Sequence, residues 1–192
     1  CILANYSHKI TPALLSRCTR FRFQPLPNDA VEKRMANVLV HEHLRISPAA
    51  KEALLELSNG DMRRVLNVLQ ASKATLESPQ DEITDEVIYE CCGAPRPQDI
   101  QTILKSILED DWSTAYDTLT RIRSSNGLAL IDLIESIVKI LEEYKLKKEE
   151  TRISLLSQLG DIEYAISKGG NDKIQSSAVI GAIKSSFELE LV

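Results

Sequence analysis

The chain has 192 residues, of which 43% are hydrophobic and 27% charged, and its formal net charge is -5. This is the composition of an ordinary globular protein with apolar material for one or two cores, and seven Gly and seven Pro are too few for a long flexible linker. The acidic balance argues against DNA binding by the chain on its own, because attraction to phosphates needs clustered Lys and Arg.

The first 24 residues form a basic segment. Residues 1–24 contain Lys9, Arg17, Arg20 and Arg22 and no acid, so all 28 acidic side chains follow them. An anion would therefore be met at this end of the chain.

Cysteine spacing and hydropathy exclude two further classes. The four cysteines form no CxxC or Cys/His pattern, so no metal site is predicted. No apolar run reaches the roughly 18 residues of a membrane span.

Residues 1–24 predict the end of an α/β sheet. The stretch "CILAN" is typical of a short buried strand that ends at Asn5, Thr11-Pro12 predicts a helix start, and "TRFRF" alternates as a half-buried strand does. Ligands bind beyond the carboxyl ends of such strands, so Asn5 is a candidate to contact a water or a phosphate. Because the chain begins abruptly with this apolar stretch and without Met, we expect it to be part of a longer protein.

Capping residues divide residues 28–93 into three or four short helices. Polar residues that favour N-caps alternate here with apolar runs of helical spacing, and glycine favours helix ends. The predicted N-caps are Asn28, Ser47, Asp61 and Thr84, and the predicted terminating glycines are Gly60 and Gly93.

A linker candidate, "APRPQD", precedes a second helical part. Its two prolines disfavour helix at the residues before them. Apolar residues then recur at helical spacing, which predicts a compact bundle. The five predicted helices span about 97–110, 111–124, 128–147, 149–168 and 172–190. The predicted fold class is thus mainly α.

Several motifs together resemble one family. "ILANYSHKITPALLSRCTRFRF" followed by "LSNGDMRRVLNVLQ" is similar to clamp-loader ATPases of the AAA+ class, and more narrowly to the small subunits of replication factor C. "YECCGAPRP", "LKSILEDDW" and "ISKGGNDKIQSSAVIGAIK" look closest to one subunit of the fungal complex. The resemblance covers essentially the whole chain, and Ser16-Arg17-Cys18 is its most specific element.

The resemblance implies three parts. Residues 1–24 would be the C-terminal tail of an AAA+ nucleotide-binding domain, residues 25–93 a small helical lid domain, and residues 94–192 a helical collar domain that joins the subunits.

It also implies three site residues. Asn5 matches sensor 1, which positions the attacking water. Arg17 matches the arginine finger, a catalytic residue that acts in trans on a neighbour's ATP. Arg63 matches sensor 2, which contacts ATP bound to its own subunit, with Arg64 as the alternative. Arginine suits both roles because its planar fork binds phosphate bidentately and stays protonated.

The function implied is that of a subunit of an ATP-dependent loader that places a DNA sliding clamp in replication and repair. Its partners would be the other replication factor C subunits in a nuclear hetero-pentamer, the sliding clamp and primer-template DNA, with no membrane. The cofactors of the full-length family are ATP and Mg²⁺.

The chain lacks a GxxxxGK[ST] loop and an acidic Walker B strand before Asn5. We therefore expect it neither to bind ATP tightly nor to hydrolyse it alone. Two alternatives remain open: a non-catalytic helical adaptor with a coincidental Ser-Arg-Cys motif, and a subunit of another AAA+ machine.

Overall fold

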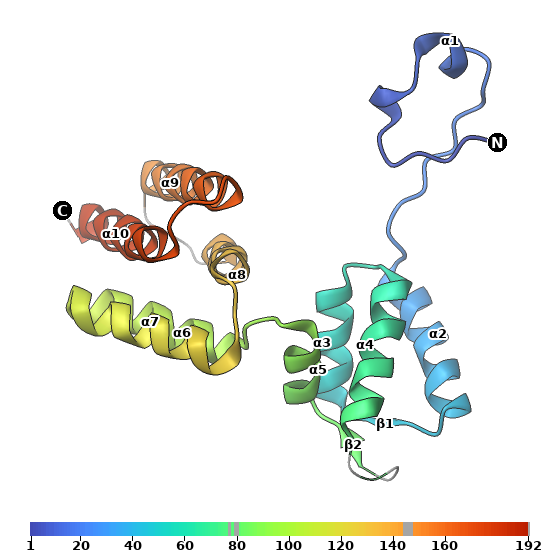
Figure 1. Cartoon of the computed structure of the whole chain (residues 1–192), viewed down its shortest axis with the longest axis horizontal. Helices are drawn as coiled ribbons and strands as arrows, with labels where there is room; N and C mark the ends of the chain where they lie inside the picture. Colours follow the sequence, from blue (N-terminus) through green and yellow to red (C-terminus); the bar gives the residue numbers. More distant parts are fainter. Residues whose placement is uncertain (77, 79–80, 144–147, 192) are drawn as a thin grey trace.

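The computed structural model describes residues 1–76, 78, 81–143 and 148–191, and most of them are helical (Figure 1). The helices are η1 (Ser7–Lys9), α1 (Pro12–Leu15), α2 (Asn28–His41), α3 (Pro48–Ser58), α4 (Met62–Thr75), α5 (Asp85–Cys92), α6 (Pro97–Glu109), α7 (Trp112–Asn126), α8 (Leu130–Glu143), α9 (Glu149–Ser167) and α10 (Asp172–Leu191). The two strands are β1 (Arg45–Ile46) and β2 (Glu82–Ile83).

Most predicted helix boundaries are confirmed to within a few residues. Ser47 caps α3, where its Oγ accepts a hydrogen bond of 3.1 Å from the Ala50 N–H. Asp61 caps α4 in the same way through the Arg63 N–H. Gly93 ends α5 with a φ of 63°, a conformation that glycine adopts without strain. The helix expected over 128–147 is described as Leu130–Glu143, and residues 144–147 lie outside the described residues.

Two caps were wrong by one residue. Asn28 lies inside α2, because Pro27, with φ fixed by its ring, occupies the cap position and its carbonyl accepts the first helical hydrogen bonds. Asn59, with a φ of 49°, is the C-cap of α3, and Gly60 follows it at 75°. Both shifts lie within the usual fraying of helix ends.

The prediction missed a small parallel sheet between β1 and β2. Arg45 pairs with Glu82 and Ile46 with Ile83, and the Ser47 N–H extends the pairing to the Ile83 carbonyl. Two residues are too few for an alternating pattern to be visible in the sequence. The sheet holds the start of α3 beside the start of α5.

Helices α2–α5 surround one hydrophobic core. Val31 and Met35 of α2 are buried, as their helical spacing predicted, and they face α3 and α4. The core contains Val31, Met35, Ala50, Ala53, Leu54, Leu55, Val65, Val68, Leu69, Ile83 and Ile88.

Helices α6–α10 surround a second core. The predicted stripe of α6 is buried at Ile100, Ile103 and Ile107, while Leu108 stays 45% exposed. Leu130, Leu133, Ile134, Ile137 and Leu141 bury the apolar side of α8. No residue of the described chain belongs to both cores, and the boundaries at residues 24 and 93 stay predictions.

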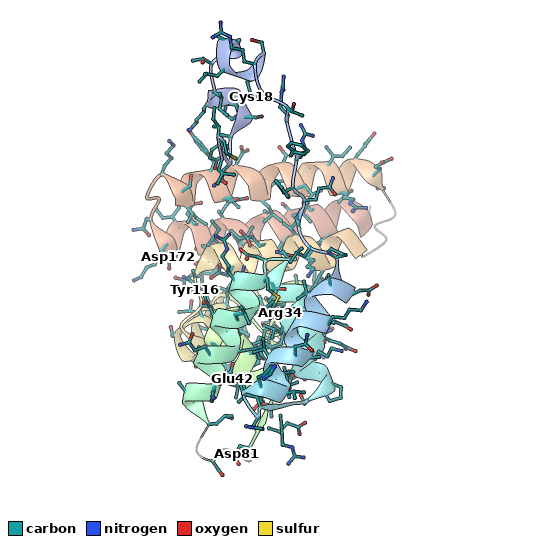
Figure 2. The ribbon with its side chains drawn as sticks, turned by 90° about the vertical axis from the view of Figure 1, so that its right-hand side faces the viewer. Cys18, Arg34, Glu42, Asp81, Tyr116 and Asp172 are labelled. Atoms are coloured by element: carbon teal, nitrogen blue, oxygen red, sulfur yellow. The ribbon has the colours of Figure 1, made fainter. Side chains whose placement is uncertain are left out.

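The N-terminal segment, residues 1–27, extends away from both helical groups (Figures 1 and 2). The predicted strands "CILAN" and "TRFRF" are absent from it, and Phe21 and Phe23 are 80% and 89% exposed. A strand is defined by backbone hydrogen bonds to a neighbour, and no such bond among the described residues involves these two stretches. The strand prediction is therefore wrong for this structure.

A network around Arg123 joins three elements of the second helical group. Its guanidinium makes two hydrogen bonds to the Asp172 carboxylate, at 2.9 and 3.0 Å, and one of 3.1 Å to Ser176 Oγ. Its Nε also contacts the Leu128 carbonyl in the turn after α7. The Arg123 side chain is only 16% exposed, so the hydrogen bonds that connect α7 to the start of α10 are partly shielded from water.

We expect Arg123→Met to lower the free energy of unfolding by about 1–3 kcal/mol, because the variant keeps the apolar volume but leaves the buried Ser176 hydroxyl unpaired. Urea unfolding followed by circular dichroism measures it. Lys105→Met, which removes an exposed pair of 3.9 Å with Glu109, is the control and should change stability by less than about 0.5 kcal/mol. Equal effects of the two substitutions would contradict the importance of the network.

Candidate functional site

Asn5 lies at a bend just before η1 and is exposed. The buried strand expected to present it is not formed, so its position at a strand end is not seen here. Its neighbours make local contacts instead: the Tyr6 ring packs edge-on against His8, and Lys9 Nζ lies 4.9 Å from the centre of that ring.

Arg17 follows the short helix α1. The turn is closed by a hydrogen bond of 3.1 Å from the Arg17 N–H to the Leu14 carbonyl and by one from Ser16 Oγ to the Ala13 carbonyl. The side chain of Arg17 is exposed, and no described residue pairs with its guanidinium. In Figure 2 the adjacent Cys18 lies at the end of the molecule opposite Asp81. Arg17 is therefore presented outward from the helical groups.

Arg63 lies in the first turn of α4, where Asp61 holds it. Its backbone N–H donates to Asp61 Oδ1 at 2.9 Å, and its Nε and Nη2 contact the two carboxylate oxygens at 3.4 Å each. The side chain is 90% exposed, so an anion from outside can reach it. The sequence predicted Asp61 as a helix cap but gave no sign of this ion pair.

The charge of Asp61 is stabilised by the same contacts. The side-chain hydrogen bonds from Arg63, and then its backbone N–H, hold the pKa of Asp61 below its ordinary value. The carboxyl group is therefore ionised throughout the neutral pH range.

Arg64, the alternative to Arg63, faces a different neighbour. Burial raises the pKa of Cys92 at the end of α5, and the positive charge of Arg64 acts in the opposite direction. Arg64 is exposed, as Arg63 is, so exposure alone does not distinguish the two side chains.

Gly60 brings the N-terminal segment into contact with the start of α4. The Leu26 N–H donates to the Gly60 carbonyl at 3.2 Å. A Cβ at Gly60 would lie 2.6 Å from the Leu26 carbonyl oxygen and 2.9 Å from Pro25 Cβ. Only glycine permits this approach, and Gly60 directly precedes the Asp61 cap.

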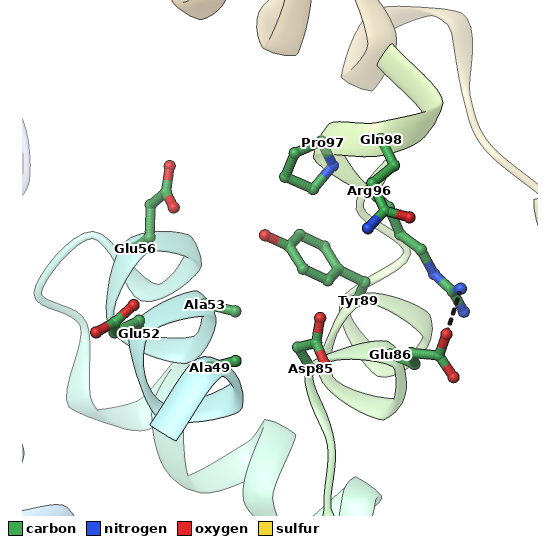
Figure 3. Close-up of a pocket in the computed structure, with 10 residues that line it drawn as sticks. All are labelled: Ala49, Glu52, Ala53, Glu56, Asp85, Glu86, Tyr89, Arg96, Pro97 and Gln98. Carbon is green, nitrogen blue, oxygen red and sulfur yellow. Dashed lines mark hydrogen bonds and ion pairs between the residues drawn. The ribbon is translucent and has the colours of Figure 1, made fainter. Parts of the chain in front are cut away.

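None of the three candidate residues lines either of two hollows found among the described residues. The first, of about 280 Å³, lies between α3, α5 and the start of α6 (Figure 3). Figure 3 shows Glu52 and Glu56 on its α3 side, Asp85 on its α5 side and the Tyr89 ring between them. The second lies where the linker meets the end of α7. Within the described ranges, no group of three or more His, Cys, Asp or Glu side chains could hold a metal ion.

The candidate residues thus form no single pocket. Asn5 and Arg17 belong to the protruding segment, whereas Arg63 lies at the start of α4, away from α1 in Figures 1 and 2. None of the described helices is both long and apolar enough to cross a membrane.

Comparison with known proteins identifies the class to which this chain belongs. Residues 95–182, which contain α6–α9 and the first half of α10, match the family model of the replication factor C C-terminal domain. The similarity to replication factor C subunits extends over the whole chain, and the chain belongs to this family.

The chain is 73% identical to replication factor C subunit 3 of Saccharomyces cerevisiae over 193 aligned residues. This alignment covers 100% of the chain and 57% of the yeast protein. It is 50% identical to subunit 3 of Blastobotrys adeninivorans over 99% of its length, and 40% identical to subunit 5 of Homo sapiens over 98%. The resemblance to the third subunit of the fungal complex is confirmed. The chain spans between 54% and 57% of the length of these three relatives.

We expect Gly60→Ala to lower the free energy of unfolding by about 1–3 kcal/mol, because it combines a strained φ of 75° with a backbone clash. Gly93→Ala is a matched control: its φ is also positive, at 63°, but a Cβ there meets nothing within 4 Å. Thermal unfolding should show the larger loss for Gly60→Ala. An equal loss for both variants would mean that contact with Leu26 adds nothing.

Proposed function

We propose that this chain is the C-terminal part of a small subunit of the nuclear clamp loader that uses ATP to place a sliding clamp on primer-template DNA. The single observation that carries the proposal is the identity of 73% to replication factor C subunit 3 along the whole chain. Coincidental similarity of the Ser-Arg-Cys motif would not extend over all the other segments, which disfavours the adaptor and an unrelated AAA+ machine.

In this function, residues 1–24 complete a nucleotide-binding domain and present two polar groups. Asn5 orients the water that attacks the γ-phosphate in its own subunit. Arg17 reaches the ATP of the adjacent subunit, and its exposure without a partner in the described chain supports an outward role. Hydrolysis transfers a phosphoryl group to water, and the guanidinium stabilises the negative charge that spreads over its oxygens.

Arg63 contacts the phosphates of ATP bound to its own subunit. Both arginines are exposed, and Arg63 is favoured over Arg64 because Asp61 holds its guanidinium at the helix start. Helices α6–α10 supply the collar that joins this subunit to the other replication factor C subunits in a hetero-pentamer. ATP and Mg²⁺ are the cofactors of the complete subunit, and this chain supplies side chains toward the nucleotide but no phosphate-binding loop.

Arg17→Ala in the full-length protein should leave complex assembly intact and slow hydrolysis at the adjacent site by a factor of about 10³ or more, the usual range for an arginine finger. Size-exclusion chromatography and single-turnover hydrolysis measure the two effects. Arg20→Ala, a change of the same type three residues away, should preserve the rate. Failure of the Arg17→Ala subunit to enter the complex would remove the support for a finger.

The chain of 192 residues, purified alone, should show no ATP hydrolysis above background, because it has no phosphate-binding loop. Phosphate release with Mg²⁺ and ATP in excess measures this. Turnover that persists after repeated purification would contradict the assignment of the missing groups to the rest of the protein.

A further inference from the structure

Asp61 and Arg63 face each other at the start of α4 through three contacts. One is the capping hydrogen bond from the Arg63 N–H, and the others join the guanidinium to both carboxylate oxygens. The cap is short, at 2.9 Å, whereas both guanidinium contacts are long, at 3.4 Å. The carboxylate therefore holds the backbone firmly and the guanidinium loosely.

The charges at this helix start explain why the pair forms. The first turn of α4 contains Arg63 and Arg64 and no acid, although a helix N-terminus carries partial positive charge. Asp61 is the negative group that offsets the charges of the two arginines and the partial positive charge of the helix N-terminus. Because the pair is exposed, it is weak and can open when a stronger anion arrives.

Two contacts of the preceding residues hold the backbone of Asp61 in place. Its N–H donates to the Ser58 carbonyl at 2.9 Å, and Gly60 before it is packed against Leu26. The carboxylate therefore keeps its place when the guanidinium moves. It remains at the helix start as a permanent alternative partner for Arg63.

We propose that Asp61 is a positioning residue that holds Arg63 at the start of α4 and competes with the nucleotide's phosphates for its guanidinium. This rests on the proposed role of Arg63 toward ATP. A phosphate bound bidentately takes either the Nε and Nη2 donors or the Nη1 and Nη2 donors, and Asp61 already occupies Nε and Nη2. Nη2 has one hydrogen for each pair, so the carboxylate competes directly with a phosphate that is bound through Nε and Nη2.

The competition lowers the affinity of the site for nucleotide. A nucleotide bound in this geometry must displace the Asp61 carboxylate from Nε and Nη2, while the capping hydrogen bond to the backbone persists. Asp61 thus lowers the affinity for ATP without weakening the helix that carries Arg63. When nucleotide leaves, the carboxylate returns the guanidinium to a defined position at the helix start.

Asp61→Asn separates the two roles, because asparagine caps helices about as well as aspartate but carries no charge. We would reconstitute the complex with the full-length protein and titrate it with a photoreactive azido-ATP, which labels the subunit that binds it. The expected result is half-saturation of this subunit at about two- to fivefold lower concentration, the range of an exposed ion pair. Asp61→Ser, a second neutral cap, should reproduce it.

Two matched controls define the cause. Asp29→Asn removes the same charge from the first turn of α2 and should leave half-saturation unchanged. The double variant Asp61→Asn/Arg63→Ala should gain little over Arg63→Ala alone, because no guanidinium remains to be released. The thermal unfolding temperature of Asp61→Asn should fall only slightly below that of the parent, because an exposed charge at a helix start contributes only weakly to stability.

Unchanged or weaker labelling in both neutral variants would overturn the proposal. So would an equal gain in the Arg63→Ala background, which would show simple repulsion between carboxylate and phosphate. The proposed role of Arg63 toward ATP is tested by a different variant, Arg63→Ala alone. If this variant leaves labelling unchanged, Arg63 does not contact the nucleotide, and the proposed competition is wrong as well.

Discussion

The path from the N-terminal segment into the helices depends on one close backbone contact. Pro25 and Leu26 lie so near Gly60 that no side chain fits there, and a hydrogen bond from Leu26 secures the approach. Gly60 leads directly to Asp61, which caps α4 and holds Arg63. The same contact therefore determines where the segment leaves the helices and where α4 begins.

The two arginines assigned to phosphates are held in different ways. Arg17 extends from a short helix with no partner among the described side chains, whereas Arg63 is restrained by Asp61 at a fixed helix start. In the proposed function the first serves a neighbour's nucleotide and the second serves its own subunit's. The chain thus contributes to two sites, and neither can be complete within it.

Most of the helices could be predicted from residue patterns in the sequence. Ser47, Asp61 and Gly93 have strong local preferences at helix ends, and the isoleucines of α6 repeat at helical spacing, so these elements could be predicted. The pairing of Arg45 with Glu82 could not, because it joins two very short strands far apart in sequence. The contacts of Arg96 with Glu86 and Glu90 also lacked a signal, because they depend on how the linker turns back toward α5. At the other extreme, "TRFRF" has the alternation of a strand but no neighbour to pair with in this structure, and pattern alone cannot supply one.

The two helical groups are joined across their boundary by charged side chains. Arg96 in the linker binds Glu86 and Glu90 of α5 at 3.1 and 2.9 Å, and Lys139 of α8 pairs with Glu56 of α3. These groups are partly solvated, and dissolved ions screen them over a Debye length of about 8 Å at physiological ionic strength. The relative orientation of the two helical groups is thus supported by contacts that weaken as the salt concentration rises. In the proposed function, the lid could therefore tilt against the collar while both hydrophobic cores stay intact.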